Sequence, residues 1–381
     1  MKLLVLGAGL QGGAAAFDLL RNPDVERIGL ADIDSERLEQ ASSRLADRRL
    51  ETHEIDAGDT EQVTELMGRY DACLSAVNYW YNLELTRAAI EAGTHFCDLG
   101  GNNDVVRAQL ELDSRAFDAG ITVVPDCGLA PGMANVLAAY GIRRLTEVST
   151  VRIRVGGLPQ HPKPPLDYQL VFAVEGLINE YVERCIAVRD GVKLFAEPLT
   201  EVEEIEFPAP FGKLECFHTS GGLSTLAHTF AGRVRDMDYK TIRYPGHCAR
   251  MRTLLELGMF DTAPVPVGDT EVRPRQVTAR VLERLLTGND QDVVLLRVTV
   301  AGSKHGGRRR LEFEIVDYAD EANGITAMMR CTAYPASIVL QMLASKQIEA
   351  RGVVVQERCV PAEPFIAELG KRGIQVVERQ S

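Results

Sequence analysis

The chain has 381 residues, enough for two domains, because single hydrophobic cores stop growing beyond about 250–300 residues. Its formal net charge of −12 argues against nucleic acid or an anionic membrane as a partner, and no apolar run approaches the roughly 18 residues of a membrane span. Eight cysteines are scattered without a Cys-x-x-Cys pair, as expected for buried free thiols in a reducing compartment. We therefore expect a soluble, cytoplasmic protein.

The first 130 residues alternate apolar, strand-like runs with helical segments. Six strands are predicted, at Lys2–Leu6, Arg27–Asp32, Leu50–Ile55, Ala72–Val77, His95–Leu99 and Ile121–Pro125. A helix over Gln11–Arg21 follows the first strand, and Asn22-Pro23 ends it. This alternation predicts an α/β fold with an N-terminal Rossmann domain built on a doubly wound parallel sheet.

The pattern changes after a predicted helix at Gly132–Leu145. A strand is expected at Thr150–Val155, ended by the proline-rich stretch Gly156–Pro165. Asp190-Gly191 predicts a hairpin turn. Two further runs alternate in polarity as in an antiparallel pair, and three more helices are expected. These segments are Val293–Ala301 and Arg309–Tyr318, then Val171–Glu183, Cys248–Met259 and Arg275–Leu286.

The last fifty residues return to an α/β pattern. A helix is predicted at Ala336–Ala344, a short strand at Gly352–Val355 and a second helix from Glu363. We expect this segment to pack against the first domain. The Rossmann domain would then be discontinuous, formed by residues 1–130 and 331–381. Residues 131–330 would form an inserted α+β domain with a mostly antiparallel sheet, for substrate binding and dimerisation.

A glycine-rich loop links the first strand to the first helix. Its sequence, Gly7-Ala8-Gly9-Leu10-Gln11-Gly12, follows an apolar strand and has an acid about twenty residues on, as in dinucleotide-binding loops. Gly7 permits the tight turn, Gly9 lets the backbone approach the pyrophosphate, and Gly12 lets the helix pack closely. Asp32 ends the second strand, where a carboxylate accepts hydrogen bonds from the ribose hydroxyls, and no arginine follows it. The sequence therefore predicts NAD rather than NADP.

Further ligand-binding positions are expected where the strands end, because ligands of such sheets bind outside the carboxyl ends of the strands. Asp98 is the best-placed carboxylate for proton transfer or for holding an amine, although it could instead cap the following helix. Gly128 suggests a backbone that approaches the cofactor closely, or else a plain helix-entry turn. The remaining cofactor contacts are expected at Asp56 and Ala57 near the adenine, and at Ser75, Ala76, Val77 and Asn78 near the nicotinamide ribose.

The middle of the chain contains a dense polar stretch, Thr219–Thr225 followed by Asp238–His247. Arg243 interrupts a strand-like run, and its planar guanidinium suits bidentate capture of a carboxylate; the alternative is a structural ion pair. Three histidines lie in this region, at 218, 228 and 247, without the spacing of a metal site, so no metal is expected. A single histidine as an acid, a base or a substrate ligand stays open beside a packing role.

These motifs resemble the saccharopine dehydrogenase-like family of NAD(P) enzymes over nearly the whole chain. The resemblance lies in the glycine loop with Asp32, Cys97–Gly101, Gly128–Gly132, Lys240–Gly246 and Tyr334-Pro335-Ala336. Within the family, the chain is most similar to the lysine 6-dehydrogenase branch. That similarity lies in Gly156–Pro159, Pro165–Tyr168, Ser220–Thr225 and Tyr239–His247.

The resemblance implies NAD-dependent oxidation of the ε-amino carbon of L-lysine. The product would be 2-aminoadipate 6-semialdehyde, which cyclises to a piperideine carboxylate, with release of ammonia and NADH. Arg243 and Thr241 would hold the α-carboxylate, Tyr168, Ser220 and His228 would line the pocket, and Asp98 or a nearby histidine would act as the base. A homodimer is expected. The alternatives are a dehydrogenase of saccharopine or another secondary amine, and a catalytically silent NAD-binding protein.

Overall fold

The computed structural model describes residues 1–288 and 291–381, which divide into two compact units. The first unit comprises Met1–Tyr140, Ser224–Leu226 and Met329–Val376, and the second comprises Gly141–Leu223, Ala227–Met328 and Val377–Ser381. The sequence analysis assigned all of residues 331–381 to the first domain. That is wrong for the last five residues, because β18 (Val377–Gln380) pairs with β16 (Gly307–Tyr318) in the second unit.

The first unit contains a seven-stranded parallel sheet in the order β17-β6-β5-β4-β1-β2-β3. This confirms the predicted doubly wound sheet. The order reverses between β1 and β4, and ligands of such sheets bind at this switch point. The strands are β1 (Lys2–Leu6), β2 (Arg27–Asp32), β3 (Leu50–Glu54), β4 (Ala72–Ser75), β5 (His95–Asp98), β6 (Thr122–Val124) and β17 (Gly352–Val353).

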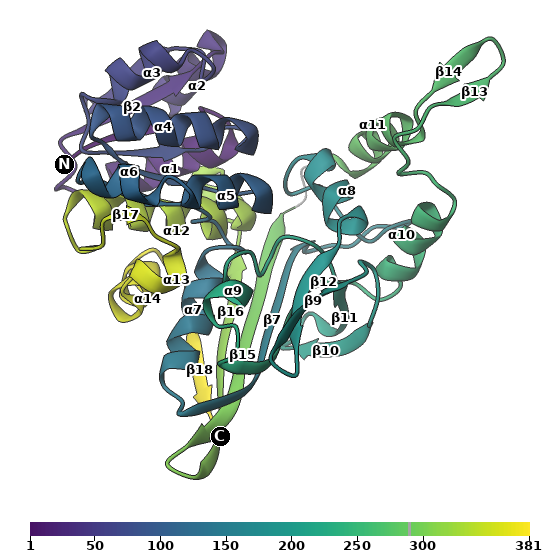
Figure 1. The fold of residues 1–381 in the computed structure, drawn as a ribbon. Helices are drawn as coiled ribbons and strands as arrows, with labels where there is room; N and C mark the ends of the chain where they lie inside the picture. The colour runs from purple at the N-terminus through teal and green to yellow at the C-terminus, as the bar shows by residue number, and fades with distance from the viewer. Residues whose placement is uncertain (289–290) are drawn as a thin grey trace. The chain divides into compact units, whose positions relative to one another are not determined.

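Helices cover the faces of this sheet, which is why β1 is apolar on both sides. Leu85 and Ala89 of α4 pack with Leu4 and Leu6 of β1 in one buried cluster, and Figure 1 shows α4 running in front of the strands. The helices that lie mainly in this unit are α1 (Leu10–Leu20), α2 (Ser35–Leu45), α3 (Thr60–Met67), η1 (Tyr79–Tyr81), α4 (Asn82–Ala92), α5 (Asn103–Leu110), α6 (Asp113–Asp118), α7 (Met133–Arg143), α12 (Ala327–Ala344), α13 (Gln356–Cys359) and α14 (Ala362–Lys371).

A buried ion pair fastens the C-terminal segment to α1. Asp18 is 2% exposed and accepts hydrogen bonds from Ser337 Oγ at 2.6 Å and from Arg372 Nε at 2.8 Å. The helix that carries Ser337 is longer than predicted, since α12 runs through Pro335 rather than starting after it. Burial of the apolar residues before the proline outweighs the roughly 3 kcal/mol that an internal proline costs a helix.

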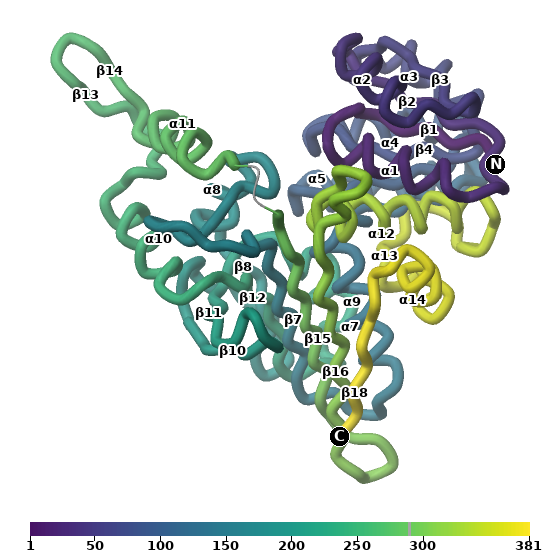
Figure 2. The backbone as a smooth tube through the Cα atoms, turned by 180° about the vertical axis from the view of Figure 1, so that it is seen from behind, coloured from purple at the N-terminus to yellow at the C-terminus, as the bar shows by residue number. Residues whose placement is uncertain are grey.

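The second unit contains a nine-stranded sheet in which β12 and β7 form a parallel pair and the other pairs are antiparallel. This confirms the mostly antiparallel sheet, and Figure 2 shows β7, β15, β16 and β18 side by side. The strands are β7 (Glu147–Pro159), β8 (Cys185–Arg189), β9 (Val192–Ala196), β10 (Glu203–Phe207), β11 (Gly212–His218), β12 (Val234–Arg243), β15 (Asp292–Lys304), β16 and β18.

Two local features of this sheet test the predictions. The β8–β9 hairpin turns at Asp190-Gly191, both with positive φ, as predicted. The predicted end of β7 at Val155 is wrong, because Gly156–Leu158 continue the pairing with β15.

The remaining elements are α8 (Val174–Val182), α9 (Leu226–Thr229), α10 (His247–Glu256), α11 (Pro274–Leu286), η2 (Glu321–Asn323) and the hairpin strands β13 (Val265–Val267) and β14 (Thr270–Val272). Among the described residues, no helix combines the length and the hydrophobicity needed to cross a membrane.

Candidate functional site

The glycine loop contains two glycines that the fold requires, Gly7 and Gly12, and one that faces open space, Gly9. A Cβ on Gly12 would lie 1.7 Å from the Gly7 carbonyl oxygen, and one on Gly7 would lie 2.8 Å from the Ala76 carbonyl oxygen. A Cβ on Gly9 would meet no heavy atom within 4 Å. Gly9 is also the N-cap of α1, so it offers no side chain to the first-turn amides. These amides and the open space above them suit the phosphates of a dinucleotide.

Asp32 ties the end of β2 to this loop. Its Oδ2 accepts a hydrogen bond from Ala8 N at 2.6 Å, and its Oδ1 accepts one from Asp34 N at 2.9 Å. Asp34, in turn, caps α2, which leaves Asp32 free of that task. The carboxylate oxygens have lone pairs left for ribose hydroxyls, and their negative charge opposes a 2′-phosphate.

The residues after β4 lie beside the glycine loop, as β1 and β4 are neighbours in the sheet. Ser75 is buried, and its Oγ donates to Asn82 Oδ1 at 2.7 Å, so this side chain supports α4. Ala76 is the residue whose carbonyl approaches Gly7. The next two positions, Val77 and Asn78, are half-buried and exposed respectively.

The ends of β2 and β3 give the surface expected near the adenine. Asp56 is exposed, and its Oδ1 accepts a hydrogen bond from Gly58 N at 2.8 Å, which closes the turn before α3. Ala57 is half-buried in the same turn. Ile33, directly after Asp32, is 66% exposed and adds apolar surface that the sequence analysis did not single out.

Leu10 and Gln11 begin α1, and they differ in exposure. Leu10 is 67% exposed, and so leaves apolar surface at the loop. Gln11 has a buried Oε1 without a hydrogen-bond partner in the described part of the chain. A buried carbonyl oxygen of this kind is satisfied by a donor from a ligand or from water.

Asp98 does not have the placement expected of a base. It is fully buried at the end of β5, where Oδ1 accepts hydrogen bonds from Gly100 N at 2.8 Å and Asp126 N at 3.1 Å. Gln109 Nε2 donates to Oδ2 at 2.7 Å, and burial raises the pKa of the carboxyl group. The capping alternative is wrong, because Asn102 caps α5. Asp98 holds together the loops after β5 and β6.

The loop after β6 contains an acid in a strained backbone conformation. Asp126 has a positive φ of 63°, is 1% exposed and accepts a hydrogen bond from Ser224 Oγ. Burial, reinforced by the charge of Asp98, raises the pKa of Asp126 to about 8. Gly128 bridges to Gly132, where a Cβ would lie 2.1 Å from the Gly128 carbonyl oxygen. This geometry is that of the helix-entry turn, so we do not retain Gly128 as a cofactor contact.

In the second unit, a polar cluster surrounds the buried Arg243 at the end of β12, and its members are buried except Glu180, whose side chain is 26% exposed. We call its members, which are Tyr168, Glu180, Tyr181, Arg243 and His247, the Arg243 cluster. The guanidinium donates from Nε to Tyr181 Oη at 3.1 Å and from Nη1 to the Ile242 carbonyl at 2.9 Å. Its Cζ lies 4.6 Å from the centre of the Tyr168 ring, and the residue is 2% exposed.

Hydrogen-bond donors fix the protonation of His247. Because arginine can only donate, the Tyr181 oxygen accepts from Arg243 and its proton points to His247 Nε2 at 3.0 Å. His247 Nδ1 then donates to the Leu166 carbonyl at 2.9 Å. Burial and the charge of Arg243 lower the pKa of His247 to about 3, so the ring stays neutral. This histidine therefore positions Tyr181.

Glu180, like Tyr181, is a member of this cluster that the sequence analysis did not single out. Its Oε2 is buried, makes no hydrogen bond within the described residues, and lies 3.5 Å from Arg243 Nη2. Burial outweighs the attraction of Arg243 and raises the pKa of Glu180 to about 7. The structure thus shows the ion pair that was the alternative for Arg243, although a long one, and the capture of a substrate carboxylate stays a prediction.

The other predicted substrate ligands have different surroundings. Thr241 shares one face of β12 with Arg243, and its Oγ1 lies 3.3 Å from Tyr239 Oη. Ser220 Oγ donates to the Asn179 carbonyl at 3.3 Å, near the end of α8. His228 is exposed, with Nε2 3.1 Å from the Lys193 ammonium, so the structure gives no support to a pocket-lining role.

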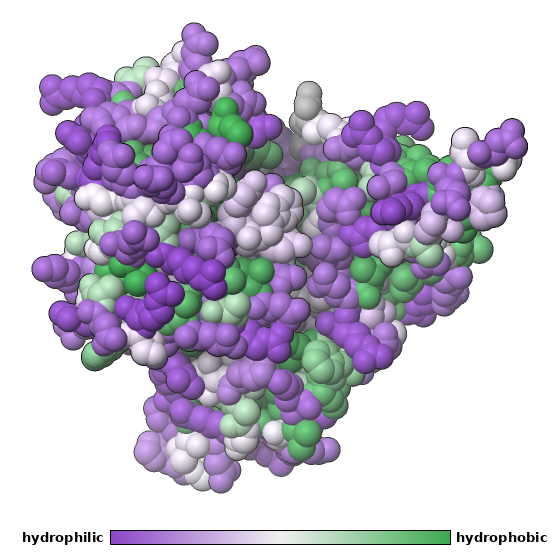
Figure 3. All heavy atoms as spheres, turned by 45° about the horizontal axis from the view of Figure 1, so that its top comes forward, coloured by the Kyte–Doolittle hydropathy of each residue, from purple (hydrophilic) through white to green (hydrophobic). Residues whose placement is uncertain are grey.

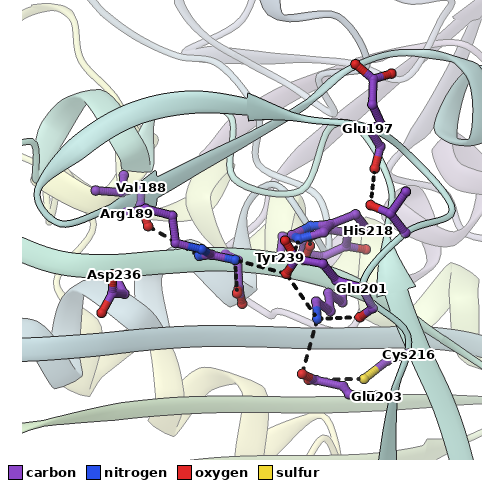
Figure 4. A network of polar contacts seen from close by, with 12 residues as sticks. Val188, Arg189, Glu197, Glu201, Glu203, Cys216, His218, Asp236 and Tyr239 are labelled. Atoms are coloured by element: carbon purple, nitrogen blue, oxygen red, sulfur yellow. Dashed lines mark hydrogen bonds and ion pairs between the residues drawn. The ribbon is translucent and has the colours of Figure 1, made fainter.

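A charged network on the same sheet contains three possible metal ligands, on Glu201, His218 and Asp238, whose ligand atoms lie within 4.8 Å of one another. Cations already pair with both carboxylates. Arg189 lies 3.0 Å from Asp238 and 3.2 Å from Glu201, and Lys240 lies 3.7 Å from Glu201. Figure 4 shows Arg189 and His218 directed at Glu201. These ion pairs account for the clustering of the three side chains as a structural network.

Two family models together cover most of the chain. Residues 3–124 match the "Saccharopine dehydrogenase NADP binding domain", and residues 128–374 match the "Saccharopine dehydrogenase C-terminal domain". The chain belongs to the saccharopine dehydrogenase family. As a member of this family it is an oxidoreductase with a nicotinamide cofactor, which agrees with the expectation from its motifs.

Similar proteins span most or all of the chain. Carboxyaminopropylagmatine dehydrogenase from Synechocystis is 22% identical over 98% of this chain and 96% of its own length. The NADP(+)-dependent, L-glutamate-forming saccharopine dehydrogenase from Schizosaccharomyces pombe is 20% identical, over 85% of this chain and 87% of its own length. The apo structure of histidine-tagged, L-Glu-forming saccharopine dehydrogenase from Saccharomyces cerevisiae superposes with a TM-score of 0.80 at 18% identity, covering 100% of this chain and 99% of that one.

Proposed function

We propose that this protein oxidises the carbon that bears the ε-amino group of L-lysine, with NAD⁺ as the acceptor. The carbon that bears the neutral amine loses a hydride, the nitrogen lone pair forms a double bond to it, and an iminium ion results. Water adds to the iminium carbon, and ammonia leaves as the aldehyde forms. The product, 2-aminoadipate 6-semialdehyde, then cyclises by attack of its own α-amino group.

The observation that supports this proposal is the long ion pair between Arg243 and Glu180. A cation and a carboxylate held 3.5 Å apart are complementary to the carboxylate and the ammonium of an α-amino acid. The guanidinium would bind the substrate carboxylate, and Glu180 Oε2, which lacks a hydrogen bond within the described residues, would bind the α-ammonium. The α-carboxylate and the α-ammonium of the substrate would replace the one long contact between Arg243 and Glu180 with two short contacts.

Neighbouring side chains would keep the guanidinium in place. Tyr181 receives a hydrogen bond from Arg243 and gives one to His247, so Arg243 is oriented before substrate binds. The Tyr168 ring packs against the guanidinium. Thr241, on the same face of β12, would add a hydroxyl for the carboxylate.

The cofactor would be held by the first unit. Gly9 and the first turn of α1 would bind the pyrophosphate, and Asp32 would bind the adenosine ribose and favour NAD⁺ over NADP⁺. When bound, the nicotinamide accepts the hydride. Asp98 would act as a positioning residue, since three donors already occupy its carboxylate.

A second candidate is oxidation of a secondary amine that carries an amino-acid end. The names of the relatives support it, since saccharopine is such a compound. Arg243 and Glu180 would fit its amino-acid end equally well, so the two candidates differ in what lies beyond the reacting nitrogen.

A panel of substrates separates the candidates. The protein is incubated with NAD⁺ or NADP⁺ and with L-lysine, cadaverine, 6-aminohexanoate or saccharopine, while reduced coenzyme and ammonia are followed. We expect turnover of L-lysine with NAD⁺ and weak turnover of cadaverine, which lacks the carboxylate. Reduction with saccharopine but not with lysine would favour the second candidate. Tight NADH binding without turnover of any amine would overturn both.

A further inference from the structure

The second unit contains a small cavity beside the Arg243 cluster. Its volume is about 120 Å³, and its walls come from the end of β7 with the loop that follows, within residues 159–169, and from residues 285–288 at the end of α11. At roughly 30 Å³ per water molecule, this space holds about four waters. Drug-sized ligands need pockets of roughly 300 Å³ or more. The cavity therefore suits a ligand of only a few non-hydrogen atoms.

Tyr168 belongs both to the Arg243 cluster and to the wall of this cavity. The residue is 5% exposed, and its Oη makes no hydrogen bond within the described residues. The centre of its ring lies 4.6 Å from Arg243 Cζ and 5.4 Å from the centre of the His247 ring, so two neighbours hold the ring. Burial raises the pKa of Tyr168, so the oxygen keeps its proton. A buried hydroxyl without a partner is satisfied by a ligand or by water.

The wall combines positive charge with apolar surface. Lys163 and His161 are exposed residues of the wall, and none of the described lining residues is acidic, in a chain with 54 acids. An ammonium and a hydroxyl both donate hydrogen bonds, which a carboxylate accepts. Three prolines and two leucines supply the apolar part, which consists of Pro159, Pro164, Pro165, Leu285 and Leu286. Figure 3 shows hydrophobic residues at the surface where α10 and α11 lie in Figure 1. This mixture suits an organic anion rather than an inorganic one.

The loop that forms the wall is fixed without a ligand. Asp167 N donates a hydrogen bond to the Lys163 carbonyl oxygen at 2.9 Å, and Leu170 N donates one to the Leu286 carbonyl oxygen at 3.0 Å. Asp167 Oδ2 also accepts a hydrogen bond from Arg250 Nη1 at 3.0 Å. Four prolines between positions 159 and 165 have fixed φ angles. A site that is already ordered loses little conformational entropy on binding, which favours the binding of a small ligand.

We propose that this cavity binds the carboxylate of a small organic acid that is separate from the substrate. Tyr168 Oη would donate to a carboxylate oxygen, Lys163 would supply positive charge, and the alkyl part would contact the prolines and leucines. The bound acid would also hold the Tyr168 ring, which packs on the Arg243 guanidinium.

One consequence rests on the proposed function. If Arg243 binds the substrate carboxylate, the acid should lower the KM for L-lysine. It should leave the KM for cadaverine, which has no carboxylate, unchanged. Because coupling between two binding sites is reciprocal, L-lysine should then raise the affinity for the acid.

The first test measures binding and needs no turnover. The full chain is titrated with propanoate, with neutral propionamide and with inorganic phosphate, by calorimetry and by saturation-transfer NMR of the propanoate protons. We expect one propanoate per chain, bound at least about tenfold more tightly than propionamide or phosphate. Y168F, which keeps the ring, and K163M should each weaken binding about fivefold or more. The matched control K304M removes another exposed lysine close to a histidine, away from the cavity, and should bind propanoate as the wild type does.

The outcomes separate this site from the substrate site. Melting temperature and NADH binding report whether each variant is folded. Propionamide that binds as tightly as propanoate, or propanoate binding that survives both Y168F and K163M, would overturn the proposal. Competitive inhibition of lysine oxidation by propanoate would also overturn it, because the acid would then occupy the substrate's own carboxylate position. If L-lysine is not oxidised but propanoate binds with the expected pattern among the variants, the proposed function fails and the acid site stands.

Discussion

Replacing Glu180 by glutamine keeps the shape of the side chain but removes its negative charge. This is the charge that we propose binds the α-ammonium of the substrate. A hydrogen bond to a charged group contributes about 1.5–3 kcal/mol, and each 1.4 kcal/mol is a factor of ten in binding. The KM for L-lysine should therefore rise about 10- to 150-fold. The melting temperature should change little, since Oε2 makes no hydrogen bond within the described residues and burial already disfavours its charge.

The pH dependence of this loss follows from the raised pKa. With a pKa of about 7, Glu180 is ionised above pH 7 and protonated below it. The advantage of the wild type over E180Q should be fully present at pH 8–9 and should shrink as pH falls through 7. Initial rates of both proteins between pH 6 and 9 give the ratio of the wild-type rate to the E180Q rate at each pH. The titration of the substrate amine affects both rates equally and therefore cancels in this ratio.

Two controls separate binding from structure. The substrate 6-aminohexanoate has the carboxylate and the reacting amine but no α-ammonium, so its KM should be the same in wild type and E180Q. The variant E175Q changes an exposed glutamate on the same helix and should behave as the wild type. Equal losses for lysine and 6-aminohexanoate, or a ratio that does not change with pH, would refute the assignment of Glu180.

Three further predictions concern the residues around the two ligands. R243M should raise the KM for L-lysine at least tenfold and leave that of cadaverine unchanged, because cadaverine has no carboxylate; steady-state kinetics would show equal losses if Arg243 were only structural. D98N should lower the stability by about 2–4 kcal/mol through its lost acceptors but keep the shape of the pH–rate profile, and a shifted profile in kinetic assays would restore Asp98 as a base. G12A should lower the melting temperature and abolish NADH binding, whereas G9A should fold normally and weaken only NADH binding, as fluorescence titration would measure; a G9A protein that binds NADH normally would contradict the placement of the pyrophosphate.

The sequence predicted the first unit well because its signals are local. The apolar run of β1, the glycine loop and Asp32 are contiguous or nearly so, and each has a single structural interpretation. Errors arose where distant contacts decide the outcome. Helix α12 continues through Pro335 because its neighbours are buried, and β7 continues past Val155 because β15 pairs with it.

The site was predicted less completely than the fold. Arg243 could be found because a charged residue in an apolar strand is unusual, but Glu180 could not. Its position beside Arg243 depends on how α8 packs against β12, which the spacing of residues does not encode. Asp98 was placed at the correct end of β5, yet whether its side chain points to a ligand or to the next loop depends on donors from Gln109 and Asp126.

The most direct test of the proposed reaction uses L-lysine that carries deuterium on C6. The purified protein is incubated with NAD⁺ and this substrate, and the products are analysed for deuterium in the reduced coenzyme and for ammonia. Our account predicts deuterated NADH and ammonia in equal amounts, with a slower rate than for unlabelled lysine where hydride transfer limits turnover. Ammonia with NADH free of deuterium would place the oxidation on the α-carbon. That result, or the absence of any coenzyme reduction with lysine, would contradict the account.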